Sequence, residues 1–139
     1  MFFKKKSNTK DKFNSLDIAI GTILIHAAKT DGEYHEKEKK IILQFFKTFR
    51  SDLINDAEDL LIYCEKEEEN IIEIQNLTKK IKQLEYNERI NIIEILIKII
   101  YSDDNLHALE DRLLRKIAGL IYIEDMHLGE IKIKYKKNT

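Results

Sequence analysis

The residues best suited to chemistry form a pattern, Asp-x-x-x-His-x-x-Glu, that occurs twice in the chain. The first copy runs from Asp31 to Glu38 and the second from Asp103 to Glu110. Matching positions in the two copies are 72 residues apart, and the similarity extends to the apolar residues that precede each copy. Such a repeat indicates two similar halves that pack together. It places two sets of carboxylates and imidazoles in equivalent positions.

One interpretation of the pattern is a divalent-metal site. Several carboxylate oxygens are the ligands that a hard cation such as Ca²⁺ prefers, and pairing the two turns would supply them. If imidazoles also point inward, the preference moves toward Zn²⁺ or Mn²⁺. The candidate ligands are four carboxylates, one additional aspartate and two histidines: Asp31, Glu38, Asp103, Glu110, Asp104, His35 and His107.

A second interpretation needs no metal. Gly32 suits the left-handed residue that commonly ends a helix. Glu38 and Glu110 follow His35 and His107 by three residues, as the last residue of a capping box follows the N-cap. The aspartates of both turns can accept hydrogen bonds from free backbone amides. The sequence leaves the choice between helix caps and metal ligands open, and it does not say whether the two turns meet.

The segments around these turns are predicted to be helices. Residues 15–30 and 87–102 are apolar nearly all round, which places both in the centre of a bundle. Amphipathic helices follow each turn, two more occupy residues 53–64 and 71–84 with the acidic residues 65–70 as a joint, and a short helix ends the chain. We expect an all-α fold, a single domain of about seven helices in two pseudo-symmetric halves, residues 15–66 and 70–137.

Composition, charge and motifs limit the classes of function that fit this chain. The formal net charge is −1, so no overall field attracts nucleic acid, and no catalytic motif indicates an enzyme. The basic residues 1–14 are expected to be a flexible tail before a domain spanning residues 15–139, and the basic termini allow peripheral membrane association. No uncharged apolar run is long enough to form an integral membrane segment. Cys64 is the only cysteine, and the expected compartment is the cytoplasm.

The two turns also resemble a known family. Ala-Ala-x-x-Asp-Gly-x-x-x-x-x-Glu at residues 27–38 is similar to the first turn of TerB-like proteins, named for tellurite resistance. Residues 103–110, with Arg-Leu-Leu-Arg-Lys-Ile-Ala-Gly-Leu-Ile from Arg112, resemble the second turn. The similarity runs from about residue 15 to 137 and is closest to small single-domain bacterial members. Asp104 departs from the first copy, which has Gly32 there, and the two histidines are less typical of the family.

The resemblance implies an all-helical domain of seven helices in two halves. It also implies that Asp31, Glu38, Asp103 and Glu110 are linked to divalent cations, notably calcium, in stress-related assemblies at or near the membrane. The expected function is a divalent-cation-binding module that acts through an unidentified protein partner. The alternative is a metal-independent interaction adaptor whose acidic turns are helix caps.

Overall fold

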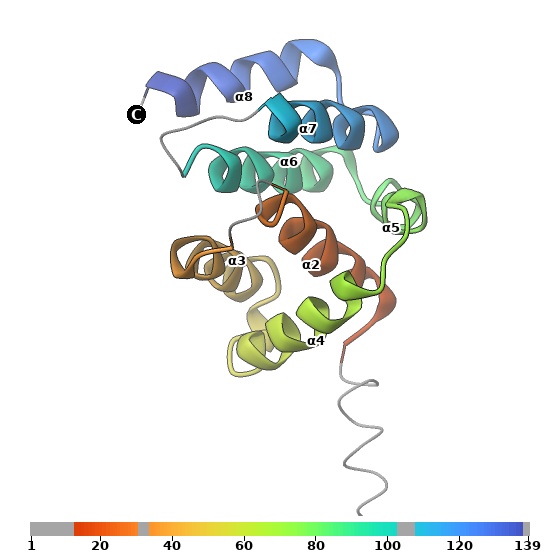
Figure 1. Ribbon diagram of the computed structural model, residues 1–139. Coiled ribbons are helices and arrows are strands. Elements are labelled where there is room, and N and C mark those ends of the chain that lie inside the picture. Colours follow the sequence, from red (N-terminus) through yellow and green to blue (C-terminus); the bar gives the residue numbers. More distant parts are fainter. Residues whose placement is uncertain (1–12, 31–33, 103–107, 138–139) are drawn as a thin grey trace, which may run out of the picture.

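Helices account for nearly all of the regular structure in the computed structural model, which describes residues 13–30, 34–102 and 108–137, with the side chains of residues 108, 109 and 137 excepted. Figure 1 shows their arrangement. The described part contains seven α-helices and one short 3₁₀ helix: α2 (Ser15–Ala28), α3 (Glu36–Phe49), η1 (Ser51–Leu53), α4 (Ala57–Glu69), α5 (Gln75–Ile81), α6 (Tyr86–Ile100), α7 (Ala108–Leu120) and α8 (Asp125–Lys137). The prediction of an all-α fold is confirmed.

The sequence repeat is visible in the helices that carry it. Shifting α2 and α3 by 72 residues gives 87–100 and 108–121, which coincide with α6 and α7 to within one residue. Seven residues separate the helices in both pairs. In Figure 1, α6, α7 and α8 form the upper part of the molecule, while α3 and α4 lie below with α2. The two acidic turns therefore follow equivalent helices.

The most apolar helix, α2, lies in the centre, as its sequence predicts. It contacts α3, α4, α5, α6 and α7, so that nearly every side chain from Ala19 to Ala28 is buried. Its start is fixed by Asn14, whose Oδ1 accepts a 2.7 Å hydrogen bond from the backbone N–H of Asp17. Asp17 accepts the return bond from the Asn14 N–H, which completes a capping box.

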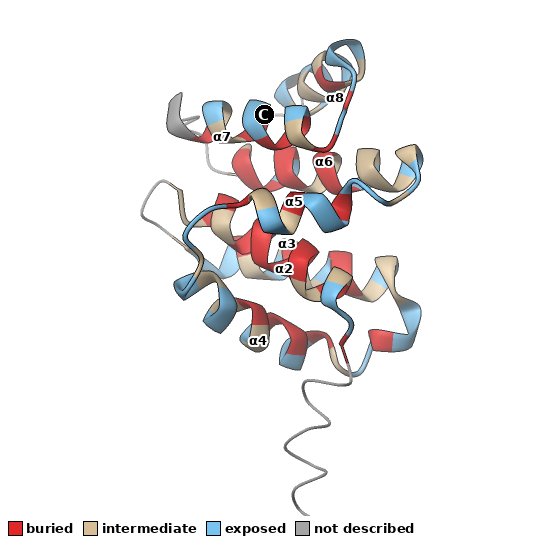
Figure 2. Cartoon of the chain, turned by 90° about the vertical axis from the view of Figure 1, so that its right-hand side faces the viewer, coloured by how far each residue is buried: buried red, intermediate tan, exposed pale blue. Residues whose placement is uncertain are grey.

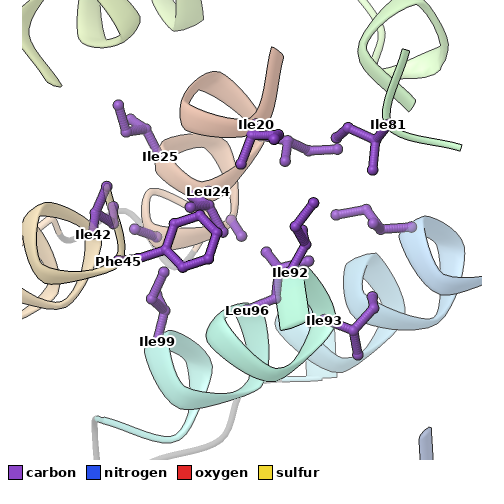
Figure 3. Close-up of a cluster of buried hydrophobic side chains, with 14 of the residues drawn as sticks. Ile20, Leu24, Ile25, Ile42, Phe45, Ile81, Ile92, Ile93, Leu96 and Ile99 are labelled. Atoms are coloured by element: carbon purple, nitrogen blue, oxygen red, sulfur yellow. The ribbon is translucent and has the colours of Figure 1, made fainter. Parts of the chain in front are cut away.

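The core forms where α2 and α6 face one another. Figure 3 shows Ile20 and Leu24 of α2 opposite Ile92 and Leu96 of α6, with side chains of α3 and α5 closing the cluster at its sides. These four side chains are at most 2% exposed. In Figure 2 the buried positions face inward from every helix, and the exposed ones lie outside. The core thus joins the two halves and fixes the relative positions of the helices that flank each turn.

Three features differ from those expected. The acidic residues Glu65 to Glu69 were expected in a joint, but they form the last turns of α4. Glu68 pairs there with His26 of α2 and with Lys29, and Glu65 lies 3.8 Å from Lys39 of α3. The last helix, expected to be short, has 13 residues. Phe13, assigned by sequence to the tail, is only 2% exposed. Among the described residues no helix is both long and apolar enough to cross a membrane.

Candidate functional site

Three of the seven candidate ligands lie in the described part of the chain. They are His35, Glu38 and Glu110, at the start of α3 and α7. The other four, Asp31, Asp103, Asp104 and His107, lie outside the described residues. The described part of the candidate site therefore consists of these residues and of the helix ends on either side of each turn.

Glu38 caps the helix that follows the first turn. Its Oε1 accepts a 2.7 Å hydrogen bond from the backbone N–H of His35, the N-cap residue of α3. This contact confirms the predicted role of Glu38 as the third residue of a capping motif. The Glu38 side chain is buried, at 4% exposure, whereas His35 is exposed. A carboxylate offers about four lone-pair positions, so capping leaves room for a cation as a further partner.

Glu110 occupies the equivalent position in the second half. It lies in the first turn of α7 and is 1% exposed. A buried carboxylate is stable only when hydrogen bonds or a positive charge replace the water that it has lost. The same acidic residue is therefore buried at the same place in both copies, which is unusual for a residue type that mostly stays exposed.

The helices that lead into the turns end in the same way. The hydroxyl of Thr30 donates a 3.0 Å hydrogen bond to the carbonyl oxygen of His26, in the last turn of α2. Its repeat partner Ser102 donates a 2.7 Å bond to the carbonyl of Ile99, in the last turn of α6. The Thr30 hydroxyl satisfies one of the carbonyls at the end of α2. The Ser102 hydroxyl adds a donor to the Ile99 carbonyl, which also accepts the backbone N–H of Ser102. The local structure before both turns is thus repeated along with the sequence.

One contact between the halves brings the borders of the two turns together. Nζ of Lys37, in the first turn of α3, donates a 2.5 Å hydrogen bond to the backbone carbonyl of Ser102. Lys37 follows the first turn and Ser102 precedes the second, so the end of one turn adjoins the beginning of the other. Among the described residues, no three His, Cys, Asp or Glu side chains gather in a group that could hold a metal.

A second polar cluster is centred on Tyr34, which follows the first turn in the sequence. The Tyr34 hydroxyl donates a 2.7 Å hydrogen bond to Oε2 of Glu65 on α4. Burial, the bond to Glu65 and the nearby charges of Glu65 and Glu38 raise the pKa of Tyr34 well above its ordinary value. Lys39 places its ammonium 5.0 Å from the centre of the Tyr34 ring and 3.8 Å from Glu65. The tyrosine is therefore held as a neutral donor between α3 and α4.

Glu68 continues this cluster one turn further along α4. Its carboxylate lies 3.1 Å from Nδ1 of His26 on α2 and 2.9 Å from Nζ of Lys29, the C-cap residue of that helix. Burial alone would raise the pKa of Glu68, but the hydrogen bonds and charges of His26 and Lys29 outweigh burial and lower it. Glu68 is thus an ionised link between the end of α2 and α4.

The sequence of this chain matches one known family over most of its length. A family model described as tellurite resistance protein TerB matches residues 17–133. The chain belongs to the TerB family. The match covers both turns and extends from the first turn of α2 into α8. Comparisons with curated proteins and with solved structures gave no match.

The cluster on α4 of this TerB chain was missed by the sequence interpretation, which treated the acidic stretch as a joint. A signal for it exists. His26 and Lys29 are three residues apart on one helix, and Glu65 and Glu68 are three apart on another. Residues three apart share a helix face, so two complementary pairs predict helices that face one another. The chain contains many such pairs, however, so the sequence alone does not show which of them meet in the folded protein.

Proposed function

We propose that this TerB-family chain is a divalent-cation-binding module that acts through protein partners in a tellurite-resistance-like stress response, most naturally in the cytoplasm. The observation that carries the proposal is the burial of one glutamate at the same position in both halves, Glu38 at 4% and Glu110 at 1% exposure. The contact from Lys37 to Ser102 supports it, because that contact places the borders of the two turns side by side.

The donor chemistry fits a hard cation. Glu38 and Glu110 offer carboxylate oxygens, and the aspartates at positions 31 and 103 would add two more carboxylates from the intervening turns. His35 is exposed at the helix start, which favours an oxygen-only set and therefore Ca²⁺ over Zn²⁺. When bound, a cation would neutralise these carboxylates and hold the two turns to one another. The protein would then present a partner surface whose rigidity depends on the cation.

The experiment is thermal unfolding of chelator-stripped protein with Ca²⁺, Mg²⁺, Mn²⁺, Zn²⁺ or no divalent cation, at matched ionic strength. A cation that binds only the native state adds about 2.7 kcal/mol of stability at a hundredfold excess over its Kd. We expect the melting temperature to rise with Ca²⁺. The rise should be lost in an Asp31→Asn/Asp103→Asn variant.

A second variant separates the cation from the helix caps. Glu38→Gln/Glu110→Gln keeps a side-chain oxygen at the capping position, since glutamine also serves there, but removes both charges. It should fold and lose the response to Ca²⁺. The matched control is Glu58→Gln/Glu69→Gln, which removes two exposed charges of α4 and should keep the response.

The alternative is a metal-independent interaction adaptor, and one observation favours it. Glu38 already accepts the backbone N–H of His35, so its burial has a structural explanation. If no cation shifts the melting temperature of the wild-type chain, the acidic turns are helix caps and the adaptor is the better description.

A further inference from the structure

A groove on the other side of α2 is unconnected with the acidic turns. It has a volume of about 560 Å³ and lies between the first half of α2, the end of α4 and α5. Ligand sites in proteins commonly have volumes of this order. Figure 2 looks toward the side of the molecule on which α4 and α5 lie. We call this cavity the α2–α5 groove, and the proposal made for the groove is independent of the proposed function.

The walls of the groove are apolar and incompletely covered. Ile18 of α2 and Leu77 of α5 line it together with Ile71 and Ile72 of the segment between α4 and α5. Ile72 is 98% exposed, the highest value among the exposed large hydrophobic residues of the described chain. Together these side chains form an apolar surface that is available for another segment to cover.

One wall of the groove also contains a buried hydroxyl group, that of Thr22, without a clear hydrogen-bond partner among the described residues. Thr22 lines the groove and is 1% exposed. In the described part of the chain its hydroxyl has no hydrogen-bond partner beyond a weak approach to the Cys64 thiol. A buried hydroxyl without a partner costs free energy, and a polypeptide backbone in the groove would offer one.

The rim of the groove is acidic. Glu67 and Glu73 line it, and neither forms an ion pair with a described residue. Lys80 is the single basic residue of the lining, so the rim keeps a net negative charge. The groove therefore suits a segment that carries an apolar side chain followed by lysines.

The chain itself contains such a segment close by. Its sequence begins Met-Phe-Phe-Lys-Lys-Lys, and residues 7–12 connect these six to Phe13, two residues before Ser15 at the edge of the groove. An extended chain spans about 3.3–3.6 Å per residue, so a tether of this length reaches any point of the groove. Tethering also raises the effective concentration of the segment to about the millimolar range.

We propose that residues 1–6 dock in the α2–α5 groove of their own chain. Phe2 or Phe3 covers the isoleucines of the wall, and Lys4 to Lys6 pair with Glu67 and Glu73. The backbone of the segment supplies a partner for the Thr22 hydroxyl. A groove occupied in this way is open to other basic, apolar segments only after the first six residues leave it.

The test uses methyl NMR of the full chain with a soluble paramagnetic relaxation agent. The Ile72 methyl should be protected from the agent, whereas the methyl of Ile133, 56% exposed on α8, should not. In a Phe2→Ala/Phe3→Ala variant the Ile72 signal should shift and its relaxation rate should rise to that of Ile133. Glu67→Gln/Glu73→Gln should release Ile72 in part, whereas the control Glu58→Gln/Glu69→Gln should leave it protected.

Two results would overturn the proposal. If Ile72 is as accessible in the wild type as in the variants, residues 1–6 do not cover the groove. If protection grows with protein concentration, the segment comes from a second copy of the chain, because docking within one chain is independent of concentration.

Discussion

Arg50 donates two hydrogen bonds from Nη1 to the carboxylate of Asp17, at 2.7 and 2.8 Å. The carboxylate lies in the first turn of α2, and its side chain is 3% exposed, while that of Arg50 is 31% exposed. The pair therefore joins the end of α3 to the start of the central helix. Removing the arginine would leave a nearly buried carboxylate with one partner fewer.

We expect Arg50→Ala to lower the free energy of unfolding by about 1–3 kcal/mol, the usual cost of depriving a buried polar group of its partner. Urea denaturation measures this directly. The control is Arg115→Ala, which breaks an ion pair to Asp111 within α7 in which Arg115 is 70% exposed. Such exposed pairs contribute little, so its effect should stay below about 1 kcal/mol. Equal losses in the two variants would contradict the expectation.

Gly21 is required by the close approach of α2 to α4. A Cβ at this position would lie 2.5 Å from the Cys64 sulfur and 2.9 Å from Cζ of Phe46. Replacing a helical glycine by alanine ordinarily stabilises a helix by about 1 kcal/mol. Here overpacking costs about 1–3 kcal/mol, so Gly21→Ala should lower the melting temperature.

Gly129 provides the matched control for this substitution, because a Cβ there would meet nothing within 4 Å. Gly129→Ala in α8 should raise the melting temperature. Adding Cys64→Ala to Gly21→Ala should restore part of the lost stability, since it removes the nearest clashing atom. A stabilised Gly21→Ala single variant would show that the helices can move apart at no cost.

The elements that sequence predicts well are those whose pattern and packing agree. Helix α2 is apolar nearly all round and is buried over most of its length, and α6 repeats the pattern with a more exposed polar side. The 72-residue repeat predicts the correspondence of α2 with α6 and of α3 with α7 from the sequence alone. The burial of Glu38 and Glu110 follows the same repeat. The sequence marks both as candidate ligands or helix caps but does not show that they are buried.

What sequence could not supply depends on contacts between distant residues. The acidic run at the end of α4 looks like a solvated joint until His26 and Lys29 are known to face it. The α2–α5 groove has no sequence signature, because its walls come from three separate elements. Whether Asp31 and Asp103 complete a cation site remains a prediction, since both lie outside the described residues.

Glu68 should make the protein sensitive to acid. The pKa of its carboxyl is lowered in the folded state, since the bonds and charges of His26 and Lys29 outweigh the opposing effect of burial. A group with a lowered folded pKa stabilises the native state above its unfolded pKa, about 4.3 for glutamate, and loses this contribution as the pH falls through the folded value. The stabilisation should therefore be complete at neutral pH and decline below about pH 4.

Comparison of Glu68→Gln with the wild type across this range isolates the contribution. The variant should be less stable at pH 7, and the gap between the two melting temperatures should narrow as the medium is acidified. Glu58→Gln, at an exposed position on the same helix, should follow the wild-type curve throughout. A gap that stays constant from neutral to acidic pH would mean that Glu68 stabilises the protein through packing and not through its charge.

The role of Glu38 as a helix cap can be measured without any cation. Its Oε1 accepts the His35 N–H, and the side chain is 4% exposed, so Glu38→Ala should remove the cap and leave a small cavity. Loss of a cap typically costs about 0.5–2 kcal/mol. Glu38→Gln keeps an acceptor at the same place and should cost less. In the presence of chelator, the wild type and Glu38→Gln should therefore have the higher melting temperatures, and Glu38→Ala should have the lowest. A Gln variant as unstable as the Ala variant would show that the charge of Glu38 is needed even when no divalent cation is available.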